Sequence, residues 1–446
     1  MLNIYSDRPS RHCDGLSRRG FLQIGSLAVG GLTLPDLLRY NAVAGESGRR
    51  KSIIMICLGG GPSHLDMYDM RPAAPLEYRG EFLPVASKIP GMDMCELMPR
   101  QAEIADRFAV VRSLQWTEPC HQFNEICTGF PVKAERPSFG SIVNRIYPGG
   151  SHSLPRFVDL AGDSDKLRAE EPRYVGTAFR SFRPNGPDIE NLVLPRGVSL
   201  ERLGDRKQLR TSLDRLRRDI DASGQFLGVD AFARQALDIV TSNSVRQAFD
   251  ITQEPPELVA RYGDKKAFFR YLGVQYGFDF ESFIRARRLV EAGVPFVSLN
   301  VARWDHHCLV AAEGSIFDSY RTLLPLYDMA VAALINDLHE RGLSQDVAVV
   351  VWGEFGRTPR VNKTGGRDHW PSSGSALIAG GGLKMGQYVG QTDRRAERPS
   401  TRPYGPQNLL ATLYYVLGID PESTIRNGSG RPMYLLDDRD PIRELM

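Results

Sequence analysis

The sequence has few cysteines, little excess charge of either sign and no long apolar run, and each scarcity narrows what the protein can be. Its six cysteines are widely spaced and form no C-x-x-C pair, which argues against a cysteine-ligated zinc finger and a c-type haem. The 56 basic residues nearly balance the 53 acidic ones, so bulk charge does not indicate a nucleic-acid or membrane-surface binder. A hydrophobic fraction of 42% over 446 residues suits a globular chain with a substantial core.

The N-terminus is typical of a secretion signal. Residues 17–22 (S-R-R-G-F-L) precede an apolar run at 24–34 and the small-residue site A-V-A at 42–44. These three parts describe a signal peptide, and the paired arginines indicate the twin-arginine route. The apolar run is too short and too rich in glycine for a stable membrane-spanning helix. We therefore expect a signal over 1–44, export to the periplasm or cell envelope, and a folded domain over 45–446.

Buried strands that alternate with helices predict an α/β fold. Continuous apolar runs are typical of the buried strands of a largely parallel sheet, and such runs lie at residues 52–58, 108–113, 157–160, 295–300, 347–352 and 375–379. Amphipathic helices are expected over 315–341 and 407–417, the second ended by Gly418. Residues 198–290 hold long helical patterns with interleaved Arg and Asp, and we expect a helical insertion or cap there with a solvated face.

Polar residues gather where the expected strands end, which is where open α/β sheets bind ligands. The motifs are G-G-G-P-S-H-L-D-M-Y-D (59–69), R-W-D-H-H (303–307), G-E-F-G-R-T-P (353–359) and G-G-R-D-H-W (365–370). The chain has only eight histidines, and several of them fall in these loops. Carboxylates and imidazoles without thiolate pairs indicate a divalent-metal site. Each motif taken singly also fits a turn or a helix cap.

Together these motifs resemble one bacterial family of exported proteins, the domain-of-unknown-function family fifteen-oh-one, over nearly the whole chain. That family is similar to a distant branch of the alkaline phosphatase and sulfatase superfamily. The resemblance implies a three-layer α/β/α, alkaline-phosphatase-like fold with a metal-dependent hydrolytic site. It places Glu354 and Phe355 at the positions of an acidic and a histidine ligand, Asp305 with His307 at an Asp–His pair, and His369 at a late histidine ligand.

The chain departs from that superfamily at two places. The acidic ligand that usually follows the first strand is replaced by Gly59 or Gly60, and the first carboxylate is Asp66. Where the superfamily carries a Ser, Thr or formylglycine nucleophile, this chain has Cys120 and His121, without the C-x-P-x-R pattern of sulfatases. We keep Cys120 as a candidate nucleophile and His121 as a candidate ligand or phospho-acceptor.

The sequence therefore predicts an exported, metal-dependent hydrolase of phosphate or sulfate esters that acts on a small molecule or a glycan. The expected metal ligands are Asp305, His307, Glu354 and His369, with Asp66 or His64 nearby. The histidines favour Zn or Mn, with Ca or Mg as alternatives. The metal would act as a Lewis acid, and Arg357 and Arg367 would hold the oxyanion.

Two other interpretations remain open. One is a non-catalytic exported binding protein of the same fold that recognises a sulfated glycan or an envelope partner, which the missing nucleophile supports. The other is a redox partner of large envelope cytochrome-like proteins, which the family resemblance suggests.

Overall fold

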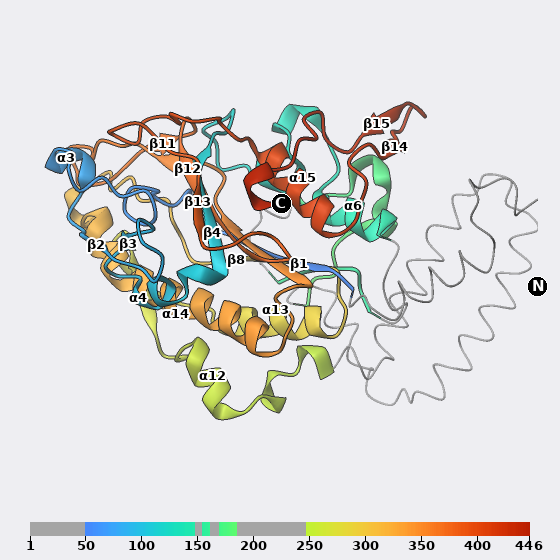
Figure 1. The fold of residues 1–446 in the computed structure, drawn as a ribbon, viewed down its shortest axis with the longest axis horizontal. Helices are drawn as coiled ribbons and strands as arrows, with labels where there is room; N and C mark the ends of the chain where they lie inside the picture. The colour runs from blue at the N-terminus through green and yellow to red at the C-terminus, as the bar shows by residue number, and fades with distance from the viewer. Residues whose placement is uncertain (1–49, 148–153, 161–168, 185–246) are drawn as a thin grey trace, which may run out of the picture. The chain divides into compact units, whose positions relative to one another are not determined.

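A seven-stranded sheet lies between two layers of helices in the computed structural model, which describes residues 50–147, 154–160, 169–184 and 247–446 (Figure 1). The strands lie side by side in the order β13 (Gln387–Val389), β4 (Phe108–Leu114), β12 (Gly374–Gly380), β9 (Val347–Trp352), β1 (Ser52–Cys57), β8 (Phe296–Asn300) and β5 (Phe157–Asp159). Only β12 runs antiparallel to its neighbours β4 and β9, and the other pairs in this sheet are parallel. The expected α/β fold with a largely parallel sheet is confirmed.

Each face of the sheet carries its own layer of helices (Figure 1). The first layer holds α4 (Pro99–Glu103), α13 (Glu281–Glu291) and α14 (Ile316–Glu340), and the second holds α5 (Asn124–Thr128), α6 (Phe139–Ile146) and α15 (Pro406–Val416). The short elements are α3 (Leu76–Arg79), α12 (Pro256–Tyr262) and the ladders β2–β3 (Pro84–Val85, Met94–Cys95), β6–β7 (Phe268–Tyr271, Val274–Gly277), β10–β11 (Gly356–Arg357, His369–Trp370) and β14–β15 (Thr424–Arg426, Pro432–Tyr434).

Strand β1 shows why the sheet is covered on both sides. Successive side chains of a strand point to opposite faces. Ile54 and Ile56 join the core beneath α13 and α14, whereas Ile53 and Met55 join the core beneath α6 and α15. Because every position of the strand from Ile53 to Cys57 is apolar, each face of the sheet requires a packed layer.

The two expected long helices are present, and residues at their ends stabilise them. Helix α14 begins after Ser315, whose hydroxyl accepts from the backbone N–H of Asp318 while the Asp318 carboxylate accepts from the N–H of Ser315. This reciprocal pair is a capping box. Helix α15 has Pro406 at its first position and ends before Gly418, whose φ of 67° is left-handed.

The expected signal at 1–44 and the helical pattern at 198–246 lie outside the described residues. The described remainder of the expected insertion, 247–290, contains α12, the β6–β7 hairpin and most of α13, and α13 packs on β1 and β8 as part of the first helix layer. No helix in the described ranges is both long enough and apolar enough to cross a bilayer.

The carboxyl ends of four parallel strands position the polar loops. Strands β4, β9, β1 and β8 run in the same direction, so the segments that follow them emerge at one edge of the sheet. The β10–β11 ladder then pairs Arg357 with His369 and brings the R-D-H-W segment to the same edge. The segments after β1, β4, β8 and β9, which are far apart in the sequence, therefore meet.

Candidate metal centre

Three histidines and one aspartate converge at this edge of the sheet. His121 follows β4, Asp305 and His307 follow β8, and His369 lies in β11. One ligand atom from each of the four residues lies within 4.8 Å of the others. The Nε2 atoms of His307 and His369 are 2.9 Å apart and lie 3.1 and 3.2 Å from Asp305 Oδ1, while His121 Nε2 is 3.3 Å from Asp305 Oδ2. The structure thus has a His/Asp cluster with the donor set for a metal ion.

The second ring nitrogen of each histidine faces an acceptor outside the cluster. His307 Nδ1 is 2.7 Å from Asp368 Oδ1, His369 Nδ1 is 2.9 Å from the carbonyl oxygen of Pro119, and His121 Nδ1 is 3.2 Å from Glu354 Oε1. A neutral imidazole has one N–H and one lone pair, so donation through Nδ1 leaves the lone pair on Nε2. Metal-binding histidines show the same arrangement.

If each ring donates through Nδ1, acceptor atoms face one another inside the cluster. With Nδ1 donating, the Nε2 atoms of His307 and His369 present lone pairs to each other and to the carboxylate of Asp305. Such an arrangement is repulsive unless a cation or a proton lies between the atoms. Metal–nitrogen bonds of about 2.0–2.1 Å place two ligands of a tetrahedral ion about 3.3 Å apart. The spacings of 2.9–3.2 Å among His307 Nε2, His369 Nε2 and Asp305 Oδ1 are close to that ligand-to-ligand distance.

The charges around Asp305 favour its ionised form. Burial acts to raise its pKa, but hydrogen bonds with His121 and His369 and the nearby guanidinium of Arg357 together hold the pKa far below its usual range. The same hydrogen bond to Asp305, together with one to Glu354, raises the pKa of His121 to about 9. In the protein without metal, His121 is therefore a cation between two carboxylates.

Glu354 holds His121 instead of joining the cluster itself. Its Oε1 accepts from the backbone N–H of Gly60 at 2.8 Å and lies 3.2 Å from His121 Nδ1, and its side chain is buried. Phe355, which follows it, stacks on His369 with ring centroids 4.2 Å apart. The sequence interpretation placed Glu354 among the ligands, whereas in the structure Glu354 contacts His121 Nδ1 and lies outside the four-residue cluster.

The two arginines expected to hold an oxyanion have their N–H groups engaged within the protein. Arg357 is fully buried and donates to the carbonyls of Gly60, Gly61 and Arg367 and to the carboxylate of Asp305. It ties the glycine turn after β1 to the loop after β8. The structure differs here from the expectation, because the guanidinium lies beneath the cluster and faces no open space.

Arg367 is likewise fully buried. Its Nε and Nη2 atoms donate to the two oxygens of Asp66 at 2.8 and 3.1 Å, and its other N–H groups donate to the carbonyls of Thr358, Pro359 and Tyr78. Asp66 is thereby occupied as an ion-pair partner and lies outside the His/Asp cluster. Arg367 anchors the segment that carries Asp368 and His369.

His64, His306 and Cys120 also lie outside the cluster. His64 is buried with Nε2 3.0 Å from the carbonyl oxygen of Ala396, and burial lowers its pKa. His306 is buried against the ring of Tyr271, and burial lowers its pKa to about 3. Cys120 Sγ is 3.8 Å from a Glu118 oxygen, and its pKa is raised, chiefly by burial, which disfavours the thiolate a nucleophile needs.

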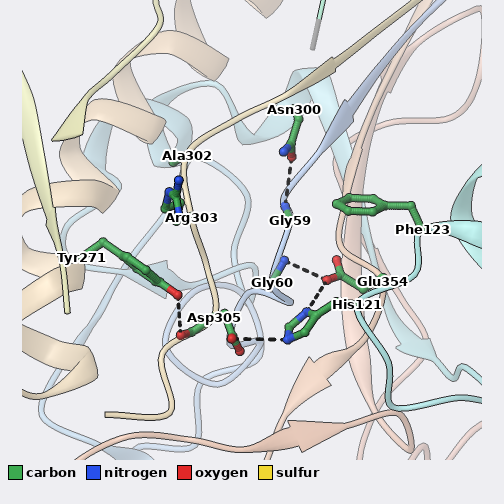
Figure 2. A pocket seen from close by; sticks show the side chains of 10 residues that line it. All are labelled: Gly59, Gly60, His121, Phe123, Tyr271, Asn300, Ala302, Arg303, Asp305 and Glu354. Carbon is green, nitrogen blue, oxygen red and sulfur yellow. Dashed lines mark hydrogen bonds and ion pairs between the residues drawn. The ribbon is translucent and has the colours of Figure 1, made fainter. Parts of the chain in front are cut away.

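A pocket of about 410 Å³ opens beside the cluster (Figure 2). Its walls come from the ends of β1, β8 and β9, the loop after β4 and the β6–β7 hairpin, and it is lined by Gly59, Gly60, His121, Phe123, Tyr271, Asn300, Ala302, Arg303, Asp305 and Glu354. Figure 2 shows the chain of contacts from Gly60 through Glu354 and His121 to Asp305, and the hydroxyl of Tyr271 bonded to the carbonyl of Asp305 at 3.1 Å.

The loop after β8 is held in an unusual backbone conformation. Ala302 and Cys308 flank the W-D-H-H segment and have left-handed φ angles of 60° and 52°. Such conformations are rare for residues other than glycine and gather at functional sites. A Cβ on Gly60 would lie 2.4 Å from the backbone nitrogen of Asp305, so only glycine permits the close approach of the two loops.

Sequence reasoning assigned no role to Asp368 or Tyr271. In the sequence, Asp368 stands out only as the neighbour of His369 in R-D-H-W. In the structure, its carboxylate contacts the ring of His307, 61 residues earlier in the chain. Tyr271 lies in a hairpin within the stretch expected to be helical. No sequence motif indicates either contact.

Comparison with known proteins gives one family and several structures of similar fold. A model of the family described as "Protein of unknown function (DUF1501)" matches residues 50–446. None of the curated proteins matches the sequence.

Among solved structures, the chain is similar to an alkaline phosphatase superfamily protein from Vibrio parahaemolyticus (12% identity, TM-score 0.37, covering 83% of this chain and 67% of that one). It is also similar to the lipoteichoic acid synthase LtaP from Listeria monocytogenes (9% identity, TM-score 0.37, covering 87% of this chain and 75% of that one). A third similar structure is the C-terminal periplasmic domain of EcEptC from Escherichia coli in complex with Zn (9% identity, TM-score 0.36, covering 90% of this chain and 93% of that one). At these values the likeness decides nothing about the site, whose chemistry follows from its own residues.

Proposed function

The chain belongs to the DUF1501 family, and for this member we propose an exported, metal-dependent hydrolase of phosphate or sulfate esters. The proposed ligands of one divalent ion are His121, Asp305, His307 and His369. This set keeps Asp305, His307 and His369 from the expected ligands and omits Glu354, Asp66 and His64. For His121 it takes the ligand role, one of the two roles that the sequence left open. The histidine-rich donor set favours Zn or Mn over Ca or Mg.

One observation carries the proposal. The Nε2 atoms of three histidines face one carboxylate, and the Nδ1 atom of each ring lies 2.7–3.2 Å from an oxygen atom outside the cluster. A buried turn or a surface ion pair does not require all three rings to be oriented in this way. Preorganised ligands with a supporting outer set of acceptors are what a metal site requires.

When bound, the ion would supply Lewis-acid polarisation of the ester and stabilise the negative charge that develops on it. Residues around the cluster orient the side chains of the proposed ligands. Glu354 and Asp368 fix the rings of His121 and His307, and Arg357 holds the carboxylate of Asp305. The pocket beside them gives an ester access to this cluster.

No serine, threonine or cysteine side chain lines the pocket in the described part of the chain. The attacking group in this proposal is therefore water. The same observation favours a second candidate, a non-catalytic binding protein that uses the metal to hold an anionic glycan or an envelope partner. Four protein ligands can also close a tetrahedral shell, as in structural zinc sites.

Turnover by the full-length, zinc-loaded chain tests the proposal. Nitrophenyl sulfate, nitrophenyl phosphate and bis-nitrophenyl phosphate would be assayed for release of nitrophenol, with and without vanadate as a competing oxyanion. The proposal expects hydrolysis of at least one ester, inhibition by vanadate, and loss of activity in His369→Ala. The matched control is His339→Ala, since His339 is exposed near the end of α14. A metal-loaded chain that hydrolyses none of the three esters and does not bind vanadate would favour the binding protein.

Export is a separate part of the proposal, supported by the signal-like sequence at residues 17–44. Replacing the arginine pair, Arg18→Lys with Arg19→Lys, should retain the full chain inside the inner membrane if the twin-arginine route is used. Cell fractionation measures this. Unchanged export of the double variant would contradict the route and leave the hydrolase proposal intact.

A further inference from the structure

The pocket needs a cation other than Arg357 and Arg367 if it is to bind an oxyanion directly. Both of those guanidinium groups are buried and bonded to carbonyls and carboxylates of the protein. Arg303 is different, because it lines the pocket, its side chain is exposed, and it forms no ion pair with any described residue.

We infer that Arg303 forms an anion-binding subsite in this pocket, and that its ligand is a tetrahedral ester group carrying a single negative charge. The inference rests on the proposed function, since the charge count below includes the divalent ion. Sulfate monoesters and phosphodiesters share this chemistry, whereas phosphate monoesters carry about two negative charges at neutral pH.

The β6–β7 hairpin holds the Arg303 guanidinium without neutralising it. The guanidinium carbon lies 4.8 Å from the ring centre of Tyr276 and 5.9 Å from that of Tyr271. Cation–π contacts of this kind orient an arginine and leave its N–H groups available to an anion. The left-handed residue Ala302 directly before it sets the direction in which the chain enters the pocket wall. Two tyrosines in place of an acidic partner are what a ligand-binding arginine requires.

The charge count of the site sets the charge of the ligand. The guanidinium groups of Arg303 and Arg357 are opposed by the carboxylates of Asp305, Glu354 and Asp368, and ligating histidines are neutral. A divalent ion then leaves one net positive charge. A monoanion neutralises this charge, whereas a dianion leaves an excess negative charge beside the buried carboxylate of Glu354.

The rest of the pocket has room for a ring. Phe123 and Tyr271 line it together with the amide of Asn300 (Figure 2). Aromatic walls with a few polar groups suit a sugar or aryl group attached to the anion. The subsite therefore selects the charged end of the ligand, and the aromatic walls accept the organic part.

Binding of non-hydrolysable esters measures the inference directly. Phenylsulfonate (one charge), methyl phenylphosphonate (one charge) and phenylphosphonate (two charges at alkaline pH) would be titrated by calorimetry into the full-length, zinc-loaded chain. We expect both monoanions to bind more tightly than the dianion. Arg303→Gln should weaken monoanion binding about ten- to hundredfold, the range that charge-assisted hydrogen bonds support, and Arg303→Lys should restore part of it. The metal content of both variants should equal that of the wild type.

The matched control is Arg270→Gln, which removes the same charge from an exposed position outside the pocket lining, in the β6–β7 hairpin that contacts Arg303. The inference is overturned if Arg303→Gln binds the monoanions as the wild type does, if Arg270→Gln weakens them equally, or if the dianion binds best. Preference for the sulfonate over the phosphonate monoester identifies sulfate esters, and the reverse identifies phosphodiesters. Metal content and ester turnover report separately on the proposed function.

Discussion

The buried ion pair between Arg367 and Asp66 gives the sharpest prediction, because it separates a structural arginine from an anion-binding one. Both side chains are fully buried and joined by two hydrogen bonds at 2.8 and 3.1 Å. Arg367→Met would leave the carboxylate of Asp66 buried without its partner. Removing one partner of a buried pair destabilises a protein by about 3–5 kcal/mol. Since native domains are stable by about 5–15 kcal/mol, the variant should still fold at low temperature.

Urea denaturation of the full chain, followed by circular dichroism, measures this change in the free energy of unfolding. The control is Arg321→Met, because Arg321 pairs with Glu81 at 2.7 Å with both side chains about half exposed. Exposed pairs contribute about 0–1 kcal/mol. Adding Asp66→Asn to Arg367→Met should restore part of the lost stability, since it removes the unpaired charge. The reasoning is refuted if Arg367→Met unfolds with the same free energy as Arg321→Met, or if it loses anion binding without losing stability.

Three further predictions concern the cluster and its supports. Asp368→Ala should weaken zinc binding about 10–100-fold, because the imidazole ring of His307 loses the carboxylate that its Nδ1 atom contacts. Competition with a chromogenic chelator measures the affinity, and an unchanged affinity would contradict the prediction. The hydrogen bonds to Asp305 and Glu354 together raise the pKa of His121 from 6.5 to about 9. Their contribution to the stability of the metal-free protein is therefore fully present below pH 6.5 and is lost as the pH rises through 9. Zinc binding near pH 7.5 should then release about one proton, measured by calorimetry in buffers of different ionisation enthalpy, and no release would refute His121 as a ligand. Gly60→Ala should destabilise the chain by about 1–3 kcal/mol and weaken zinc binding, whereas Gly176→Ala, at a similar φ but in open space, should leave zinc binding unchanged.

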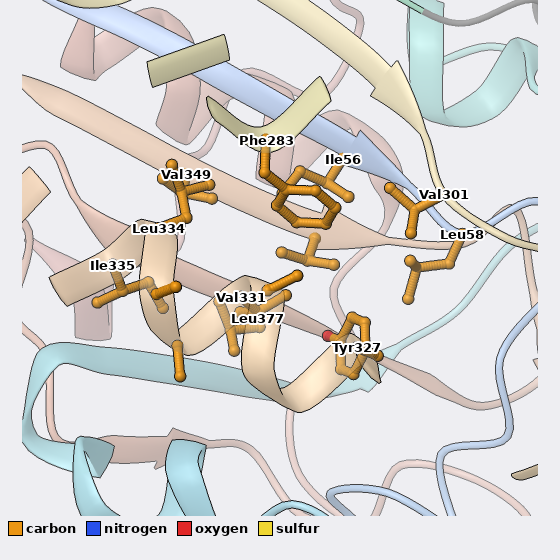
Figure 3. Close-up of a cluster of buried hydrophobic side chains, with 14 of the residues drawn as sticks. Ile56, Leu58, Phe283, Val301, Tyr327, Val331, Leu334, Ile335, Val349 and Leu377 are labelled. Carbon is orange, nitrogen blue, oxygen red and sulfur yellow. The ribbon is translucent and has the colours of Figure 1, made fainter. Parts of the chain in front are cut away.

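The fold was largely predictable because its signals are local. Continuous apolar runs indicated six of the seven strands of the central sheet, all except the short edge strand β13. Apolar spacing indicated α14 and α15, and Gly418 indicated the end of α15. Figure 3 shows the result at α14, where Val331 and Leu334, one helical turn apart, lie in the same core as Ile56 of β1 and Val349 of β9. The hairpin β6–β7 was not predicted, since its strands are short and partly exposed and carry no strong alternation.

The sequence predicted which loops form the site but not the contacts that their side chains make. Parallel strands place their carboxyl ends at one edge, so the motifs were expected to meet there. What each side chain does once there depends on partners that no motif reveals. Arg367 binds Asp66 across 301 residues, and most of the partners of Arg357 are backbone carbonyls, which leave no trace in the sequence. The sequence places Arg303, like Arg357 and Arg367, within a few residues of the expected ligands. Only the structure distinguishes it from those two, because tyrosines rather than an acid surround it.

Elemental analysis of the full-length chain tests the central claim most directly. Wild type, His369→Ala and the control His339→Ala would be equilibrated with zinc, desalted and measured by plasma mass spectrometry, with circular dichroism to show that each is folded. The account predicts one zinc ion per chain in the wild type and in His339→Ala, and a large loss in His369→Ala. Folded wild-type protein without stoichiometric zinc or manganese, or His369→Ala with as much metal as the wild type, would contradict it.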